Sequence, residues 1–421
     1  MTEKTTICCS FCGIERSKVK KLIQGPDVFI CDECVDLCQE ILAEDNSEKK
    51  AKLKSTEIPS PTKIKEFLDK YIIGQDDAKI AMAVAVNNHY KRVENPVIDG
   101  VEIDKSNMLL LGPTGSGKTY IAKTIARMLD VPFVVADATS LTESGYVGDD
   151  VETIVARLIQ EANNDVTKAE RGIIYLDEID KKTKKSEGTS ITRDVSGEGV
   201  QQALLKIIEG SNMRVSLQGS RKHPQAETIA INTKNILFIM GGAFVGIDEI
   251  VRRRINKNKT AIGFGADDSF VEKNAADKNE LLAQVEPEDI VTFGLIPEFV
   301  GRLPVITHLN ELDESQLLDI LTKPKNAIIK QYEKMFTLED IKLTITKDAL
   351  TFIAADAIKR KTGARGLRGI LEKKLTPIQF KLNDWRHSGV EAITLDASFF
   401  AEGAEPALTY KQETQSGDTT Q

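Results

Sequence analysis

The sequence predicts an α/β fold: a five-stranded parallel sheet covered by helices, flanked by a cysteine-rich module and a smaller second domain. Three observations carry this prediction. Short apolar strands recur between about residues 107 and 307 and alternate with helical segments, a glycine-rich loop follows the first strand, and every cysteine lies near the N-terminus. Strands that alternate with helices pair in parallel, so we expect helices on both faces of the sheet.

Composition predicts a globular protein of two or three domains. The 421 residues exceed what one core covers, 41% are hydrophobic, 29% are charged, and the net charge is −8. This acidic balance argues against a nucleic-acid-binding protein, which usually carries a basic surplus. No apolar run approaches the ~18 residues of a membrane span, and no signal-peptide apolar region begins the chain. We therefore expect a cytoplasmic protein without a membrane partner.

The first 42 residues are expected to form a zinc-binding module. Two Cys-x-x-Cys pairs are separated by 18 residues, a spacing typical of a four-thiolate site, and so short a segment needs such a site to fold. The predicted ligands are Cys9, Cys12, Cys31 and Cys34, with Cys8 or Cys38 as an alternative to a neighbour. Residues 1–42 carry five basic and seven acidic side chains, which favours a protein-contact or dimerisation module over a nucleic-acid finger.

A linker is expected to separate this module from a large domain. Residues 43–61 are charged, end in Pro-Ser-Pro and contain few apolar side chains, which is the composition of a flexible linker. The α/β pattern begins at about residue 62 and predicts a large domain over 62–312. Its strands are expected at 107–111, 133–136, 172–176, 235–240 and 304–307.

The loop after the first strand has the pattern of a phosphate-binding loop. The run Gly112-Pro-Thr-Gly-Ser-Gly-Lys-Thr lies between an apolar strand and an amphipathic helix. Glycines let backbone N–H groups point at phosphate oxygens, and the helix N-terminus adds its dipole. Lys118 supplies a charge for the β- and γ-phosphates, and the Thr119 hydroxyl is a ligand for Mg²⁺. The residues expected to bind a nucleoside triphosphate are Pro113, Thr114, Gly115, Ser116, Gly117, Lys118, Thr119 and Tyr120.

Two carboxylates follow the third strand. Asp177 and Glu178 come directly after an apolar run, at the edge of the sheet where the phosphate-binding loop also lies. Asp177 is predicted to hold Mg²⁺, and Glu178 to act as the general base that polarises the attacking water. An ordinary acidic turn is the alternative for an Asp-Glu pair alone, and the phosphate-binding loop upstream makes it the weaker one.

A smaller domain is expected over 313–401. It has helical runs near 313–335 and 347–384 and short strands near 341–345 and 391–395. Residues 402–421 are polar and are expected to form a disordered tail.

Over nearly its whole length the chain resembles the AAA+ ATPases, and within them the unfoldases that serve a ClpP-type peptidase. The resemblance covers the zinc module, the linker, the large ATPase domain and the small lid domain. It implies ATP, Mg²⁺ and Zn²⁺ as cofactors and a homohexameric ring. It also implies protein substrates and adaptor proteins as partners, with no nucleic acid and no membrane.

Four short motifs resemble narrower features of this family. Gly145-Tyr146-Val147-Gly148 resembles its first pore loop, and the segment around Arg193 its second pore loop. Arg221-Lys222-His223 resembles its basic entrance loop, and Ile262-Gly263-Phe264 the tripeptide that docks on the peptidase. Taken alone, Tyr146 would be a surface tyrosine and the basic triplet a solvated patch.

The remaining matches concern ATP hydrolysis. Arg302 resembles the finger that reaches a neighbouring subunit's γ-phosphate, and Arg365 the sensor arginine that couples nucleotide state to the lid. Ile72 and Ile73 lie in a segment that resembles the lining of the adenine pocket. Arg302 and Arg365 join Lys118, Asp177 and Glu178 in the expected catalytic set. The fourth strand departs from the wider superfamily, because it runs into Met240-Gly241-Gly242 where many relatives have a polar sensor residue.

The function expected from these residues is ATP-dependent unfolding of proteins and their translocation into a ClpP-type peptidase. The chain itself is not expected to be a protease, because it has four histidines and no Gly-x-Ser-x-Gly elbow. Two other classes remain as alternatives: a nucleic-acid motor, which the acidic zinc module disfavours, and a nucleotide-gated scaffold with little turnover. A related unfoldase family, HslU, is a close alternative, although no N-terminal zinc module is expected in it.

Overall fold

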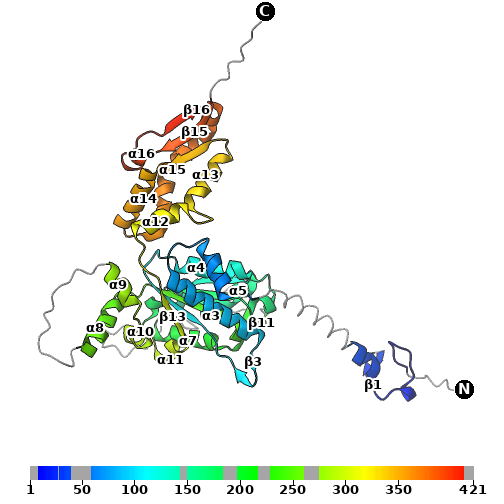
Figure 1. Ribbon diagram of the computed structural model, residues 1–421. Coiled ribbons are helices and arrows are strands. Elements are labelled where there is room, and N and C mark those ends of the chain that lie inside the picture. Colours follow the sequence, from blue (N-terminus) through cyan, green and yellow to red (C-terminus); the bar gives the residue numbers. More distant parts are fainter. Residues whose placement is uncertain are drawn as a thin grey trace, which may run out of the picture. The chain divides into compact units, whose positions relative to one another are not determined.

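The computed structural model describes residues 8–26, 28–38, 58–142, 149–183, 197–216, 228–259 and 275–411. The chain divides into two compact units, Met1–Ile58 and Pro59–Gln421, and each is described by itself (Figure 1). Among these residues, no helix is both long enough and apolar enough to cross a membrane.

The first unit is a small module with almost no hydrophobic core. After the short 3-10 helix η1 (Arg16–Lys18), strands β1 (Leu22–Gly25) and β2 (Val28–Cys31) form an antiparallel hairpin, and a helix follows over 32–38. In the described part of this unit, only Cys9 and Cys31 are buried apolar residues. So small a core cannot hold the module together, and the stabilising contact must come from its thiols.

The second unit is built on a five-stranded sheet, as predicted. The order is β13-β5-β12-β9-β6, and all four neighbouring pairs are parallel. The strands are β5 (Met108–Leu111), β6 (Phe133–Asp137), β9 (Ile173–Asp177), β12 (Leu237–Gly242) and β13 (Val305–His308). Every residue of β5 and β12 is buried, which is why these strands read as continuous apolar runs in the sequence.

Helices and short hairpins surround this sheet. The main core cluster joins alternate strand residues such as Leu109 and Phe238 to apolar residues of α5 and α7. The helices are α2 (Pro61–Asp69), α3 (Asp76–Glu94), α4 (Lys118–Leu129), α5 (Val151–Glu161), α6 (Val166–Ala169), α7 (Glu198–Glu209), α8 (Ile247–Lys259), α9 (Ala275–Leu282), α10 (Pro287–Phe293) and α11 (Pro297–Gly301). Short 3-10 helices and strand pairs connect them: η2 (Ala138–Ser140) with β7 (Leu141–Thr142) and β8 (Asp149–Asp150), η3 (Ile179–Lys182), β3 (Val97–Ile98) with β4 (Val101–Glu102), and β10 (Asn212–Ser216) with β11 (Thr228–Asn232) and η4 (Thr233–Asn235).

The predicted end of the linker needs a small correction. Helix α2 begins at Pro61, and the Ser60 side chain caps it by accepting a hydrogen bond from the Lys63 N–H. Proline fits the first helical position because the N–H that it lacks would have no partner there. Ser60 and Pro61 therefore belong to the large domain. Residues 39–57, which make up most of the predicted linker, lie outside the described part of the chain.

The small domain has its own core and a three-stranded sheet (Figure 1). Strands β14 and β15 are parallel, and β16 is antiparallel to β15. The elements are α12 (Glu314–Thr322), α13 (Ile328–Thr337), β14 (Lys342–Ile345), α14 (Lys347–Lys359), α15 (Gly363–His387), β15 (Val390–Leu395), α16 (Ala397–Ala401) and β16 (Ala407–Tyr410).

The predicted disordered tail is wrong for its first residues. Strand β16 completes the sheet of the small domain, and its Leu408 packs against the core, so this domain extends at least to residue 411. Three of the four β16 residues are exposed, because it is an edge strand, and the sequence therefore shows only a weak apolar signal there. Residues 412–421 lie outside the described part.

Candidate functional site

The phosphate-binding loop lies where β5 gives way to α4. Gly115 and Gly117 have φ angles of +82° and +103°, which glycine adopts without the steric cost that a side chain brings. Gly117 is the residue before helix α4, so the free N–H groups of the first helical turn face the same space as the loop. This geometry provides a concave set of backbone donors suited to phosphate oxygens.

Lys118 is held at the inner side of this loop. It is 8% exposed, and its Nζ donates hydrogen bonds to the carbonyl oxygens of Gly112 (2.6 Å) and Pro113 (3.0 Å). Burial lowers the pKa of Lys118, while the negative charge of Asp177 opposes this shift. The ammonium is therefore a poorly hydrated charge beside the loop, which strengthens its attraction for a polyphosphate.

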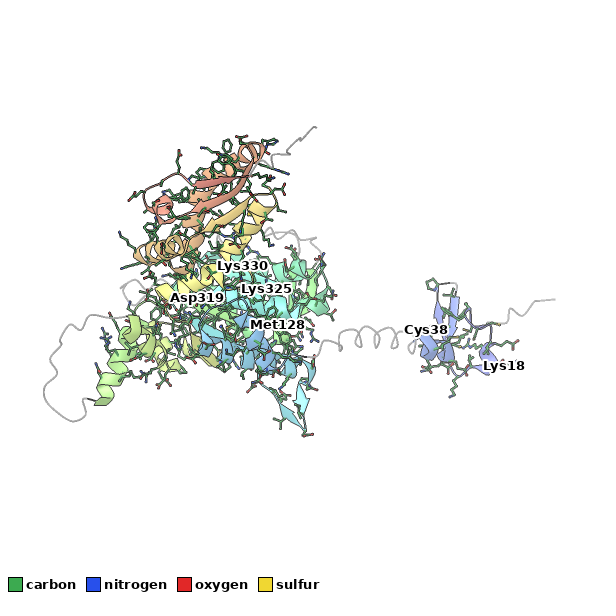
Figure 2. All side chains as sticks on the ribbon, turned by 45° about the horizontal axis from the view of Figure 1, so that its top comes forward. Lys18, Cys38, Met128, Asp319, Lys325 and Lys330 are labelled. Atoms are coloured by element: carbon green, nitrogen blue, oxygen red, sulfur yellow. The ribbon has the colours of Figure 1, made fainter. Side chains whose placement is uncertain are left out.

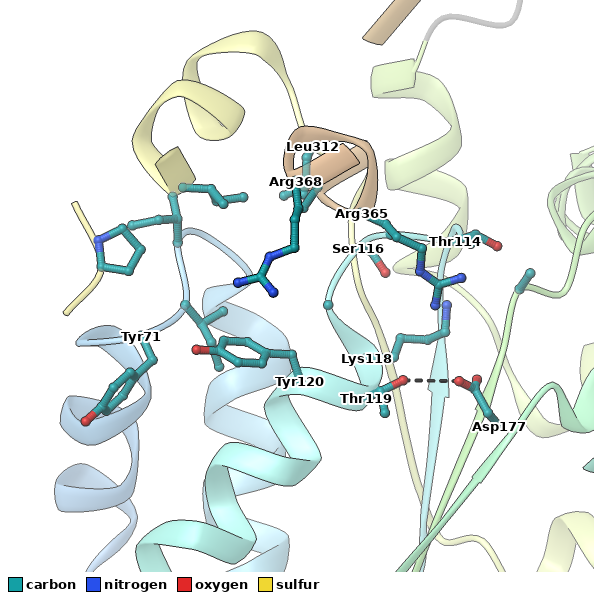
Figure 3. A pocket seen from close by; sticks show the side chains of 18 of the residues that line it. Tyr71, Thr114, Ser116, Lys118, Thr119, Tyr120, Asp177, Leu312, Arg365 and Arg368 are labelled. Carbon is teal, nitrogen blue, oxygen red and sulfur yellow. Dashed lines mark hydrogen bonds between the residues drawn. The ribbon is translucent and has the colours of Figure 1, made fainter. Parts of the chain in front are cut away.

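Thr119 and Asp177 meet directly across the site. The Thr119 hydroxyl donates a hydrogen bond to Asp177 Oδ2 at 3.1 Å (Figure 3). A hydroxyl and a carboxylate oxygen this close are hard ligands of the kind that Mg²⁺ prefers when the nucleotide supplies the rest of its coordination. Glu178, the next residue, has a left-handed backbone with φ of +56°, and its N–H donates to Asp177 Oδ1 at 3.1 Å. Such a conformation is uncommon for a non-glycine residue and is concentrated at functional sites.

A cavity of about 580 Å³ extends from this loop to the small domain (Figure 3). The structure brings together in its wall most of the residues predicted to bind nucleotide: Ile72, Ile73, Thr114, Gly115, Ser116, Gly117, Lys118, Thr119, Tyr120, Asp177, Glu178 and Arg365. Pro113 is not part of the wall, and its carbonyl oxygen instead accepts bonds from Lys118 and Ser116. Apolar side chains also line it: Leu312, just before the small domain, and Ile320 and Ile328 within that domain.

Two arginines of α15 enter this cavity, of which the sequence predicted one. Arg365 and Arg368 are three residues apart, so they share one face of the helix, and Figure 3 shows both directed into the pocket. The Arg368 guanidinium is fixed by a 2.7 Å hydrogen bond from Nη2 to Gln331 Oε1 on α13. The spacing from Arg365 is the signal that could have identified Arg368.

Backbone contacts join the two domains at the phosphate-binding loop. The Ala364 N–H donates to the Gly115 carbonyl oxygen at 3.4 Å, and a Cβ on Gly115 would lie 2.7 Å from the Thr362 carbonyl oxygen. Gln75 forms a second link, because its amide both donates to the Asn310 carbonyl and accepts from the Asn310 N–H. The phosphate-binding loop is thus bonded to the small domain itself, and the segment that includes Ile72 and Ile73 is bonded through Gln75 to the region that leads into it.

Arg302 lies away from the nucleotide pocket of its own chain. It follows α11, its side chain is 56% exposed, and its Nε and Nη2 contact Glu209 Oε1 at 2.9 and 2.8 Å. It does not line the cavity. A role at a phosphate therefore requires a second subunit.

The thiols of the first unit form a compact cluster. The Sγ atoms of the four predicted ligands, Cys9, Cys12, Cys31 and Cys34, all lie within 4.8 Å of one another. Among the described thiols, Cys8 and Cys38 (the latter labelled in Figure 2) are not in this cluster.

The protonation of these thiols fits a cation at their centre. Burial raises the pKa of Cys9, but backbone N–H groups, that of Cys12 first, outweigh it and lower this pKa to about 6. The pKa of Cys34 is raised, first by the Sγ contact with Cys31 and then by burial. Four thiolates cannot ionise so close together without a positive partner, and Zn²⁺ supplies it with tetrahedral coordination.

The remaining predicted site residues lie outside the described part of the chain. They are Tyr146, Val147, Arg193, Arg221, Lys222, His223, Ile262, Gly263 and Phe264. Their roles remain predictions from the sequence.

Three family models match the chain in succession. The model of the ClpX C4-type zinc finger matches residues 7–44, and that of the AAA domain of the Cdc48 subfamily matches residues 103–306. The model of the C-terminal, D2-small domain of ClpB matches residues 312–381. The first match covers the thiol cluster, the second covers the phosphate-binding loop with Asp177 and Glu178, and the third covers Arg365 and Arg368. Together with the five-stranded sheet and the four-thiol cluster, these matches identify the chain as a ClpX-like AAA+ protein, a nucleotide-binding, zinc-binding ATPase of the Clp type.

Proposed function

We propose that this protein is a homohexameric unfoldase that uses ATP to pull substrate proteins through its ring into a ClpP-type peptidase. The observation that carries the proposal is the composition of the nucleotide pocket. Its wall includes the phosphate-binding loop of the large domain and the two arginines of α15 in the small domain. Loss of the γ-phosphate would change the contacts of both domains at once, so hydrolysis can change the angle between them.

Each residue of the pocket has a separate role in ATP hydrolysis. Lys118 and the loop N–H groups bind the phosphates, and Thr119 with Asp177 would hold Mg²⁺, which neutralises charge developing on the phosphoryl group. Glu178 accepts a proton from the attacking water as general base. Arg365 contacts the phosphate end of the nucleotide from the lid.

Arg302 completes the site of the neighbouring subunit as an arginine finger. Its absence from the wall of its own pocket and its exposed side chain support this assignment. ATP cleavage would then require the ring, and turnover would report on assembly.

The substrate path rests on the resemblance of the loops. Tyr146 and Val147, which stand between two glycines in the sequence, would grip a polypeptide of any sequence, and Arg193 would line the same pore. Arg221, Lys222 and His223, repeated around a ring, would form a cationic collar suited to acidic or carboxylate-ended peptides. The zinc module would bind adaptors or substrates.

Ile262-Gly263-Phe264 would dock on the peptidase. Burying the Ile and Phe side chains contributes roughly 1.5–3 kcal/mol each before ordering costs, so one loop binds weakly. Six loops on one ring gain avidity.

The test is ATP-dependent loss of fluorescence from a tagged, stable fluorescent protein, with and without a ClpP-type peptidase. We expect unfolding with ATP alone and degradation only with the peptidase. Deleting residues 262–264 should abolish degradation and leave unfolding and ATP turnover intact. ATP turnover without any loss of fluorescence would reject the unfoldase, and ATP binding with little turnover would favour a nucleotide-gated scaffold.

A further inference from the structure

The central strand of the sheet, β12, ends in glycines beside the phosphate-binding loop. Strand β12 lies between β5, which leads into the phosphate-binding loop, and β9, which ends in Asp177. Gly241 is aligned with Leu110 of β5, and Met240 with Leu176 of β9. The position at which a polar side chain from this strand could reach the site is therefore occupied by glycine.

The phenol of Tyr175 fills this space from the neighbouring strand. A Cβ built on Gly241 would lie 1.9 Å from the Tyr175 hydroxyl oxygen and 2.7 Å from its Cζ, so a larger residue at position 241 would have to displace the phenol. Tyr175 is fully buried at 0% exposure. The absence of a side chain on β12 and the presence of this ring are thus two parts of one packing arrangement.

The Tyr175 hydroxyl is bonded to the carboxylate that faces Thr119. It donates to Asp177 Oδ1 at 3.3 Å, while Asp177 Oδ2 accepts from the Thr119 hydroxyl at 3.1 Å. The two oxygens of Asp177 thus each accept from a different hydroxyl, and Oδ1 also accepts from the Glu178 N–H at 3.1 Å.

We propose that Tyr175 is a positioning residue for the nucleotide-bound metal: its hydroxyl holds Asp177 so that Oδ2 faces Thr119, in place of a polar side chain from β12. The inference rests on the magnesium site of the proposed function. It adds to that site the Tyr175 hydroxyl, which does not bind the metal but orients the ligand Asp177. Such partners of metal ligands fix ligand orientation, and their removal typically costs about 10- to 100-fold in metal affinity or activity.

The first test compares two tyrosine variants. Tyr175→Phe removes the hydroxyl and keeps the ring, and Tyr90→Phe removes another buried hydroxyl, which donates to the Arg171 carbonyl at 2.9 Å outside the pocket. Mn²⁺ binding is measured by electron paramagnetic resonance in the presence of a non-hydrolysable ATP analogue, and melting temperature is measured alongside. We expect Tyr175→Phe to weaken Mn²⁺ binding by about 10-fold or more, and Tyr90→Phe to leave it unchanged.

Steady-state kinetics separate positioning from a general structural defect. In Tyr175→Phe, kcat at limiting Mg²⁺ should fall by about 10- to 100-fold, and raising Mg²⁺ should restore part of it. A merely destabilised protein would lose activity at every Mg²⁺ concentration. Tyr90→Phe, which loses a comparable buried hydrogen bond, controls for that loss.

A substitution on the neighbouring strand β12 tests the contact between Gly241 and Tyr175. Gly241→Ala places a methyl group against the Tyr175 hydroxyl and should displace it from Asp177, weakening Mn²⁺ binding to a similar extent. Because the bond is already lost, adding Tyr175→Phe to Gly241→Ala should weaken binding little further.

Two outcomes overturn the inference, and they are distinguishable. If the unmodified protein shows no nucleotide-dependent Mn²⁺ binding, the magnesium site of the proposed function fails and this inference fails with it. If the unmodified protein binds Mn²⁺ and Tyr175→Phe behaves like Tyr90→Phe, the magnesium site stands and the positioning role of Tyr175 is rejected.

Discussion

The ion pair between Arg302 and Glu209 allows two interpretations of Arg302 to be separated by matched variants. Both side chains are largely exposed, at 56% and 45%, and an exposed pair of this kind contributes about 0–1 kcal/mol to folding. Neither Arg302→Ala nor Glu209→Gln should therefore change the free energy of unfolding by more than about 1 kcal/mol. If Arg302 is only half of a surface ion pair, the two variants should behave alike.

The finger assignment predicts that they differ. Arg302→Ala removes a charge from the neighbouring subunit's phosphate and should lower ATP turnover by on the order of 10³ or more. Glu209→Gln frees the same guanidinium and should keep ATP turnover within about 2-fold, because losing one exposed ion pair changes the stability little. The assay is steady-state phosphate release, with calorimetric melting as the control for folding.

Rings that contain both Arg302→Ala and Glu178→Gln subunits test whether Arg302 acts on a neighbouring subunit. Arg302→Ala subunits keep Glu178, and Glu178→Gln subunits keep Arg302, so about a quarter of the interfaces in a random 1:1 ring contain both groups. Partial recovery of turnover is expected. If Arg302→Ala and Glu209→Gln lose ATP turnover equally, or if turnover does not recover at any mixing ratio, the assignment of Arg302 as an arginine finger is refuted.

The site and the core support three further predictions. Glu178→Gln should bind ATP normally while hydrolysis falls by about 10²–10⁴, and unaltered turnover would remove Glu178 from the mechanism. Chelating zinc, or replacing Cys9 and Cys31, should unfold the first module and release the metal without lowering the melting temperature of the ATPase unit; joint melting would contradict the division into two units. Burial, with the charges of Arg92 and Lys105, lowers the pKa of His89 from 6.5 to about 3, so protonation favours the unfolded state and stability is lost as pH falls below about 6.5. At pH 5.5 this loss is about 1.4 kcal/mol, measurable by urea denaturation, and it should be absent in His89→Gln.

The sheet and the loop were predictable because their signals are local. Fully buried parallel strands appear as apolar runs, and the phosphate-binding loop needs its glycines and its lysine in a fixed order. The spacing of the two Cys-x-x-Cys pairs likewise predicts the four clustered thiols, but it leaves Cys8 and Cys38 as alternatives, and only the fold shows that these two lie outside the cluster.

Other features depend on packing across elements, which no local pattern records. Strand β16 is an edge strand with one partner and few buried residues, so its composition resembles that of a tail. Tyr175 reads as one more apolar residue of a buried strand, and its contact with Gly241 arises only when β12 is aligned beside it. Arg368 gains its place in the pocket from the rotation of α15 and from Gln331 on another helix.

The contact between the phosphate-binding loop and the start of α15 has a consequence for protein engineering. Gly115 meets Thr362 and Ala364 through main-chain atoms, and Gly363 has a φ of +56° with its Cα close to the loop. Because backbone atoms make this contact, it depends on the backbone conformation of the turn and little on the surrounding side chains. A lid transplanted from another family member should therefore work only if the turn before its long helix keeps this conformation. Libraries intended to retune communication between the domains are better directed at the connector over 309–313, with positions 115 and 363 kept as glycine.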